Sequence, residues 1–311
     1  SYLAYTYDND GNMLTASDVN TTIAMEYNPR NQLTKITYPG NYSFVYTYDP
    51  KGNLIQRSEN DGYVTYYSYD INGNLLQVAD DKGVIVQYDY DNSGNLIKKI
   101  VRSGAYTLYL YDETGKVSSQ INHKTNGDEL SKFIYTYDDA GNPLSVETHD
   151  GIFHFTYDQD NRLLTVLFPD GNTSSYTYDY TGNRLSKTDN GIHSVYTINN
   201  RNEYVTVNDA IYSYDGNGNL IRKTESGITT TYSYNFNNRL TKITTPNGTW
   251  RYFYDPLGNR IKIDHNGNSS RYLIDPLGLG KLTNEYNENG ELISRYTYGH
   301  GLISKIDSAG N

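Results

Sequence analysis

One short pattern, Tyr-Asp-x-x-Gly-Asn, returns along the whole chain. Its clearest copy is Tyr48-Asp49-Pro50-Lys51-Gly52-Asn53, which is followed by Leu54. Most copies lie 20 or 21 residues apart, and a fixed period of this length indicates a repeat architecture. The residues equivalent to Tyr48 are Tyr7, Tyr27, Tyr69, Tyr90, Tyr111, Tyr137, Tyr157, Tyr178, Ile198, Tyr214, Tyr234, Tyr254, Ile274, Tyr286 and Tyr298.

Each repeat is predicted to be a β-hairpin. Asp49 is suited to begin a turn because its side chain can accept backbone hydrogen bonds, and Gly52 allows a positive φ. Residues 54–58 then predict one strand, and the aromatic and β-branched residues of 63–69 predict the return strand. Between them, Asp61-Gly62 is a strong hairpin signal. The Tyr-Asp turn therefore joins one hairpin to the next.

The strands are expected to have two different faces. Tyr46 and Tyr48 are two residues apart and share one face, whereas Thr47 points to the other. The leucines that open the intervening strands, such as Leu33 and Leu54, are expected to alternate with these tyrosines in a ladder. A wide flat sheet would be unstable. The predicted fold is therefore all-β, with tandem antiparallel hairpins of about 20–21 residues forming a coiled sheet: a β-spiral, shell or tube.

The array is expected to be continuous over residues 1–311 and to be a window of a longer chain, because both ends read as parts of further repeats. Three segments depart from the period: 112–136, 198–213 and 274–311. The first predicts a longer hairpin. In the last, the spacing falls to 12 residues, which predicts tighter hairpins or shorter strands.

The amino-acid composition argues against several classes of binding partner. The formal charge of −10 argues against a nucleic-acid or anionic-membrane surface, which would need a basic face. No apolar run is long enough for a membrane span, and the first residues lack the features of a signal peptide. The absence of cysteine excludes disulfides and thiolate sites.

No residue constellation predicts catalysis, a cofactor or a metal. The segment Asp8-Asn9-Asp10-Gly11-Asn12 resembles a calcium loop but lacks the distal glutamate, and a plain turn explains it without an ion. The six histidines lie at different phases of the repeat. The carboxylate pairs Asp80-Asp81 and Asp138-Asp139 fall at turns, where they can satisfy backbone amides. The sequence therefore favours a protein that is not an enzyme and has no cofactor.

The residues expected to matter are structural ones, which form the repeat signature. They are Tyr7, Asp8, Gly11, Tyr48, Asp49, Gly52, Tyr69, Asp70, Gly73, Tyr90, Asp91, Gly94, Tyr111, Asp112, Gly115, Tyr137, Asp138, Gly141, Tyr157, Asp158, Tyr178, Asp179, Gly182, Tyr214, Asp215, Gly218, Tyr254, Asp255 and Gly258.

This signature resembles the YD repeats of the Rhs family, which includes toxin-complex C components, bacterial wall-associated proteins and animal teneurins. Good matches are Tyr48-Asp49-Pro50-Lys51-Gly52-Asn53-Leu54 and Tyr178-Asp179-Tyr180-Thr181-Gly182-Asn183-Arg184-Leu185. The resemblance covers essentially the whole chain. It implies a sheet that spirals into a hollow shell, which in the toxin members encloses a C-terminal toxin.

The same resemblance raises the question of self-cleavage, because toxin-bearing members carry paired Asp-Pro-x-Gly motifs that perform it. This chain has Asp255-Pro256-Leu257-Gly258 and Asp275-Pro276-Leu277-Gly278. Each lies in the turn phase of an ordinary repeat, so autoproteolysis is not expected.

The resulting expectation is a non-catalytic structural segment of a secreted or cell-surface protein, forming the wall of a shell or tube. Its partners would be neighbouring repeats of the same chain and an enclosed toxin-like domain. The alternative is an adhesive surface protein that binds glycans through exposed tyrosines, or an extracellular tube or fibre component.

Overall fold

The computed structural model describes residues 2–277, 281–307 and 309. Residues 278–280 of the last irregular segment, and its final residues, lie outside this range. The described part contains thirty strands, and all the pairings that define their register are antiparallel; it contains no helix. The predicted all-β fold of tandem antiparallel hairpins is therefore confirmed. The chain divides into two compact units.

The first unit comprises Ser1–Asp89, Tyr234–Ile243 and Gly248–Asn311. Its strands are β1 (Ala4–Tyr7), β2 (Met13–Ser17), β3 (Thr22–Tyr27), β4 (Leu33–Tyr38), β5 (Tyr42–Tyr48), β6 (Leu54–Glu59), β7 (Val64–Tyr69), β8 (Leu75–Asp80), β9 (Gly83–Tyr90), β24 (Leu240–Thr245), β25 (Gly248–Tyr254), β26 (Arg260–His265), β27 (Asn268–Asp275), β28 (Lys281–Tyr286), β29 (Leu292–Gly299) and β30 (Gly301–Asp307).

The second unit comprises Tyr90–Ser233 and Thr244–Asn247. Its strands are β10 (Leu96–Val101), β11 (Tyr106–Tyr111), β12 (Val117–His123), β13 (Glu129–Tyr137), β14 (Pro143–Thr148), β15 (Gly151–Tyr157), β16 (Leu163–Leu167), β17 (Thr173–Tyr178), β18 (Arg184–Asp189), β19 (Ile192–Ile198), β20 (Tyr204–Val207), β21 (Ala210–Tyr214), β22 (Leu220–Glu225) and β23 (Ile228–Tyr234). The long hairpin expected between Tyr111 and Tyr137 corresponds to β12 and β13.

The pairing of β5 with β6 contains a bulge that the sequence did not indicate. Thr47 lies opposite Gln56, but Tyr48 lies opposite Leu54, so Ile55 has no partner in the register. A bulge adds one residue to one strand and changes which side chains share a face. As a result, Arg57 lies opposite Tyr46, on the face that carries the tyrosines. The same register shift occurs directly before the signature tyrosine of other repeats, such as Tyr7, Tyr69 and Tyr178.

The connecting turns follow one geometry. The amide of Asp49 donates to the Asn53 carbonyl at 2.9 Å, and the Gly52 amide donates to the Asp49 carbonyl at 3.0 Å. Gly52 has a φ of 97°. Where the glycine is absent, an asparagine adopts the same region, as Asn202 does in the degenerate unit after Ile198, with a φ of 60°. That unit therefore keeps a regular turn despite its irregular sequence.

Of the two alternatives expected after Ile274, shorter strands are not found, whereas the hairpin between β29 and β30 is tight, with Gly299 paired to Gly301. The strands β28, β29 and β30 have 6, 8 and 7 residues. The spacing falls to 12 because Ile274, Tyr286 and Tyr298 lie at or near the ends of consecutive strands, whereas elsewhere the signature ends every second strand.

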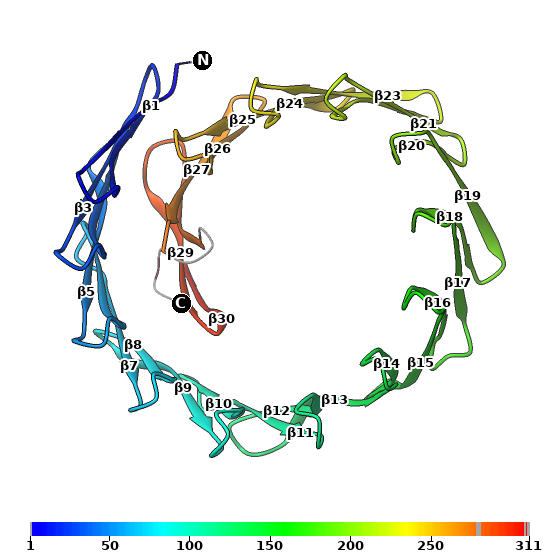
Figure 1. The fold of residues 1–311 in the computed structure, drawn as a ribbon, viewed down its shortest axis with the longest axis horizontal. Coiled ribbons are helices and arrows are strands. Elements are labelled where there is room, and N and C mark those ends of the chain that lie inside the picture. Colours follow the sequence, from blue (N-terminus) through cyan, green and yellow to red (C-terminus); the bar gives the residue numbers. More distant parts are fainter. Residues whose placement is uncertain (1, 278–280, 308, 310–311) are drawn as a thin grey trace. The chain divides into compact units, whose positions relative to one another are not determined.

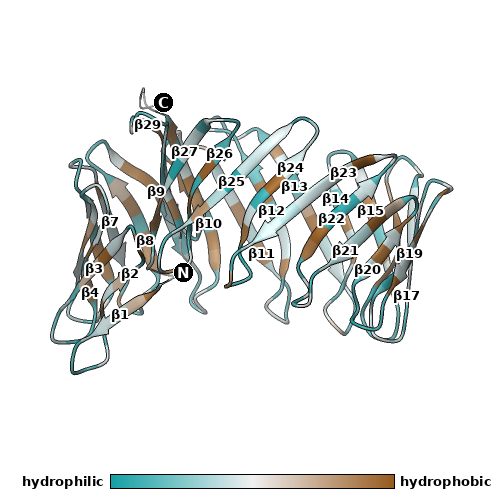
Figure 2. Ribbon diagram, turned by 90° about the horizontal axis from the view of Figure 1, so that it is seen from above, coloured by the Kyte–Doolittle hydropathy of each residue, from teal (hydrophilic) through white to brown (hydrophobic). Residues whose placement is uncertain are grey.

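The main apolar core lies in the first unit. In Figure 1 the strands β1–β9 follow a curve, and β27–β30 lie on its concave side. The core combines buried residues of β3–β5, including Ile36 and Phe44, with Leu273 of β27. Hydrophobic residues lie along the strands and hydrophilic ones dominate the turns (Figure 2). The C-terminal strands therefore convert one face of the N-terminal sheet into a buried surface.

Candidate functional site

Most of the signature tyrosines join neighbouring strands through their hydroxyl groups. The Tyr48 hydroxyl donates to the Leu33 carbonyl oxygen at 2.8 Å, and the Tyr69 hydroxyl donates to the Leu54 carbonyl oxygen at 3.0 Å. Each acceptor is the first residue of the strand that directly precedes the tyrosine's own strand. The same bond links Tyr111 to Leu96, Tyr137 to Val117, Tyr157 to Pro143, Tyr178 to Leu163, Tyr214 to Tyr204 and Tyr254 to Leu240.

The signature aspartates hold their own turns. The two carboxylate oxygens of Asp49 accept from the backbone and side-chain nitrogens of Asn53, both at 2.9 Å. The Asn53 side-chain bond and the backbone amides lower the pKa of Asp49, although partial desolvation opposes them. The same pairing with asparagine recurs at Asp8, Asp70, Asp91, Asp138, Asp179, Asp215 and Asp255.

The remaining signature residues take matching positions. Each signature tyrosine named above is the last residue of its strand. The signature glycines have φ values between 83° and 97°. The calcium-like segment is an ordinary turn, because Asp8 accepts from the Asp10 and Asn12 amides at 3.0 and 2.8 Å. Among the described residues, no cluster of His, Asp and Glu is arranged to hold a metal ion.

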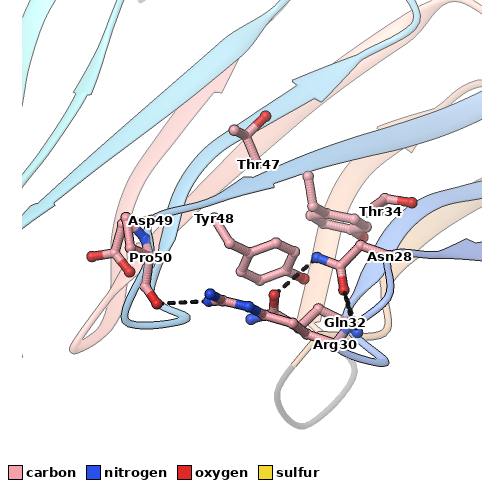
Figure 3. Close-up of a pocket in the computed structure, with 9 residues that line it drawn as sticks. Asn28, Arg30, Gln32, Thr34, Thr47, Tyr48, Asp49 and Pro50 are labelled. Carbon is pink, nitrogen blue, oxygen red and sulfur yellow. Dashed lines mark hydrogen bonds between the residues drawn. The ribbon is translucent and has the colours of Figure 1, made fainter.

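Adjacent turns also bond to each other. A groove of about 440 Å³ lies between the turn after Tyr27 and the turn after Tyr48. Figure 3 shows the residues that line it. Arg30 crosses it and donates from Nη1 to the Pro50 carbonyl oxygen at 2.6 Å. Lys51 repeats the contact one turn later, donating to the Ile71 carbonyl oxygen at 2.6 Å. The groove is therefore crossed by bonds that set the spacing of the repeats.

The contact of strands β27–β29 with strands β3–β6 is called the seam here, and many of its side chains are buried. The Tyr38 hydroxyl donates to the Ile274 carbonyl oxygen at 2.6 Å. The rings of Tyr42 and Tyr286 lie 5.0 Å apart. Burial raises the pKa of Tyr38 well above its ordinary value, and Asp255 and Asp275 add to the shift. The Tyr38 hydroxyl therefore remains a neutral hydrogen-bond donor.

Charged residues are buried beside this apolar contact. Arg57 lies 3.1 Å from a carboxylate oxygen of Asp275 and 3.2 Å from one of Glu59. The Tyr46 hydroxyl donates to the other Asp275 oxygen at 2.8 Å. All four side chains are buried. Buried charges need partners and hydrogen bonds of this kind, because each loses its hydration.

The network continues onto the last strands. Asn284 of β28 donates to Glu59 at 2.9 Å, and the Nε of Arg295 on β29 lies 3.3 Å from the same carboxylate. Arg295 also pairs with Asp61. Burial raises the pKa of Glu59, while Arg57 and Arg295 oppose that shift. Together these contacts fix β28 and β29 against β6.

The two Asp-Pro-x-Gly motifs have different environments. Asp255 makes the ordinary turn bonds, accepting from the Asn259 amide at 2.8 Å, and its burial raises its pKa. Asp275 accepts from the Leu277 amide at 2.9 Å but also binds Arg57 and Tyr46. The expectation that both lie in ordinary turns therefore describes Asp255 but not Asp275, because Asp275 belongs to the seam.

The second unit lacks a comparable core. Its described residues include two buried apolar side chains, Val166 and Ala210. The tyrosine face there is half-buried and packs against cations instead. The guanidinium of Arg184 lies 5.4 Å from the ring centroids of both Tyr176 and Tyr196. The described residues contain no helix long and apolar enough to cross a membrane.

Comparison with known proteins identifies the repeat. The model of the teneurin YD-shell matches residues 1–154 and 144–311. The chain belongs to the teneurin YD-shell family. The resemblance to YD-repeat proteins inferred from the sequence is thus confirmed. A search of curated protein sequences found no match.

Solved structures share the YD-shell fold. The crystal structure of TcdB2-TccC3-Cdc42 matches with a TM-score of 0.65 at 15% identity, over 99% of this chain and 22% of that chain. The crystal structure of TcdB2-TccC3 matches with a TM-score of 0.62 at 15% identity, over 99% and 22%. The Photorhabdus luminescens Tc holotoxin pore matches with a TM-score of 0.60 at 15% identity, over 98% and 21%. This YD-shell chain spans about a fifth of the chains it matches.

Sequence reasoning did not find the seam residues of this YD-shell. Arg57, Glu59, Asn284 and Arg295 carry no motif, and the bulge at Ile55 that brings Arg57 opposite Tyr46 has no signal in the sequence. One feature of the sequence could have indicated them. The spacing of the repeats changes after Ile274, in the C-terminal strands that form one side of the seam.

Proposed function

We propose that this chain is a non-catalytic structural segment that forms part of the wall of a hollow shell around a toxin-like cargo. The observation that carries the proposal is the tyrosine ladder. Hydroxyl-to-carbonyl bonds such as Tyr48 to Leu33 recur in both units and tie together the first and last residues of each hairpin. The signature carboxylates bind their own turns, which fits a structural role better than acid–base chemistry.

The enclosed cargo is the more specific part of this proposal. The solved structures with this fold include a Tc holotoxin pore, and the family is that of a shell. We extend both to this chain as a secreted or cell-surface protein. Its immediate partners would be neighbouring repeats of the same polypeptide, in one continuous array.

The test is limited proteolysis of the intact natural polypeptide, followed by mass spectrometry. A shell predicts that a cargo domain resists digestion while the wall is folded and is cut rapidly once denaturant opens it. The isolated cargo domain serves as the control. Equal digestion rates for the enclosed and isolated domain, or a natural polypeptide without any such domain, would contradict encapsulation.

A second function, glycan binding, is favoured by one feature of the second unit. A cavity of about 530 Å³ is lined by Phe133, Phe153 and Phe155 together with His149 and Asp150. Aromatic faces beside polar groups are suited to sugars. A glycan array probed with the protein and with Phe153→Ala tests this function. Retention that Phe153→Ala abolishes would support it, and the absence of retention would exclude it.

A further inference from the structure

A cavity of about 340 Å³ lies at one end of the seam, within the first unit. One wall is formed by residues of the N-terminal sheet, including Ile23, Tyr38 and Tyr42. The other is formed by β25–β28 and includes Phe253 and Leu273. Aromatic and aliphatic side chains dominate both walls. Its volume falls within the range of about 300–1,000 Å³ that is typical of small-ligand sites.

Four of the lining residues form one row across four strands. Phe253 of β25 lies opposite Lys262 of β26, Lys262 lies opposite Arg271 of β27, and Arg271 lies opposite Tyr286 of β28. Directly opposite residues on antiparallel strands share a face, with Cβ atoms about 5 Å apart. All four line the cavity. The row therefore presents two neighbouring cations between two aromatic rings.

Neither cation has an anionic partner among the residues that the structure describes. Like charges directly opposite each other destabilise a sheet. Among the described residues, neither Lys262 nor Arg271 forms an ion pair, since the nearby Asp264 pairs with Arg251 at 3.6 Å. The contact available to Lys262 is the Phe253 ring, whose centroid lies 5.2 Å from its Nζ. An anion bound between the two cations would relieve their repulsion.

The carboxylates that line the cavity are already engaged in their own turns. Asp18 accepts from the Asn20 and Thr21 amides at 2.8 and 2.7 Å. Asp255 accepts from the backbone and side-chain nitrogens of Asn259 at 2.8 and 3.1 Å. The cations are thus the charged groups of this cavity that remain open to a ligand.

We propose that this cavity binds an organic carboxylate with an apolar, ring-sized body. The carboxylate lies between Lys262 and Arg271, and the body packs against the aromatic and aliphatic walls. Such a group occurs in a free aromatic acid and at the C-terminus of a peptide whose last residue is apolar. The site does not depend on the proposed shell function, although the ladder residue Tyr254 is one of those that line it.

Calorimetric titration of the protein with 4-phenylbutyrate at fixed ionic strength tests the proposal. A Kd of about 0.1–1 mM is expected for a ligand of this size. Two matched probes separate the contributions: 4-phenylbutylamine keeps the body and reverses the charge, and acetate keeps the charge without the body. Both should bind at least about tenfold more weakly. Equal binding of the amine overturns the charge assignment, and equal binding of acetate overturns the apolar site.

A peptide arm identifies the source of the carboxylate. A short peptide ending in phenylalanine is compared with its C-terminally amidated form. Tighter binding of the free peptide than of the amidated one supports the site. If the free peptide also binds more tightly than phenylbutyrate, the site is assigned to peptide termini. Equal binding of the amidated peptide, together with no binding of phenylbutyrate, overturns the proposal.

Variants locate the site. Lys262→Gln and Arg271→Gln should each weaken phenylbutyrate binding about tenfold, as expected for loss of a charge-assisted hydrogen bond. Lys242→Gln on β24 is the matched control, because Lys242 is exposed and does not line the cavity. Thermal melting of each variant shows that it is folded. Unchanged affinity in the doubly substituted, folded protein would overturn the assignment.

Discussion

The hydroxyl of Tyr48 donates to the carbonyl oxygen of Leu33, 15 residues earlier, at 2.8 Å. This bond explains why the repeat uses tyrosine rather than phenylalanine. The ring covers the sheet face, and the hydroxyl reaches the adjacent strand, where it binds the backbone group that opens the same hairpin. Burial raises the pKa of Tyr48 to about 12, so the donor proton is retained at neutral pH.

The first prediction concerns this ladder. Tyr48→Phe should lower the free energy of unfolding by about 1 kcal/mol, because one hydrogen bond is lost while the ring remains. Tyr48→Ser should cost about 3 kcal/mol or more, because the ring is lost as well. Tyr180→Phe is the control, since Tyr180 is 96% exposed at a turn. Chemical denaturation measures all three, and equal values for Tyr48→Phe and Tyr180→Phe would refute the ladder.

The turn aspartates predict an acid-sensitive stability. Hydrogen bonds from Asn183 and Thr181 lower the pKa of Asp179 to about 2 from the ordinary 3.8. A carboxyl whose pKa is depressed on folding stabilises the protein above its unfolded pKa. That contribution is lost as the pH falls from about 4 to about 2. Melting temperatures of the parent protein should therefore fall over this window, and Asp179→Asn should fall less steeply. Parallel curves for both proteins would contradict the assignment.

The hairpin repeats could be predicted from the sequence, but the contacts of the seam could not. Local chemistry sufficed for the hairpin turn at Asp61-Gly62, where Gly62 has a φ of 90°. It did not reveal the bulge at Ile55, because a bulge depends on how two strands pair rather than on either strand alone. The meeting of Arg57 with Asp275 joins residues 218 positions apart. No periodic pattern specifies which repeats a later strand will cover, so these partners required the three-dimensional structure.

The buried charge network predicts that its members differ in how much their removal destabilises the protein. Arg57→Met should lower the free energy of unfolding by about 3–5 kcal/mol, because it leaves Asp275 and Glu59 buried with a cation removed. Glu59→Gln should change it by less than about 1 kcal/mol, because the remaining charges of Arg57, Arg295, Asp275 and Asp61 balance. Denaturation of both variants measures the difference. A larger loss for Glu59→Gln than for Arg57→Met would show that Glu59 is the dominant anion.

Glu59 also predicts a pH effect opposite in sign to that of the turn aspartates. Its pKa is raised in the folded protein, chiefly by burial, so the folded state holds a proton that the unfolded state has lost. Stability therefore decreases as the pH rises from the ordinary pKa of 4.5 towards the folded value. The parent protein should lose stability over this window, whereas Glu59→Gln should not. A parent curve that matches the variant would contradict the raised pKa.

The seam itself is tested by removing an apolar contact. Leu273 of β27 is buried within the core formed by β3–β5, so Leu273→Ala should lower the free energy of unfolding by about 2–5 kcal/mol through lost burial and a residual cavity. Leu302→Ala on β30 is the matched control, because Leu302 is 55% exposed. If β27–β30 are held by the seam, Leu273→Ala should also speed proteolytic cleavage within residues 281–307. Mass spectrometry of the fragments measures this. Equal cleavage of the two variants would mean that the C-terminal strands are held by other contacts, since only one of the two leucines lies in the core.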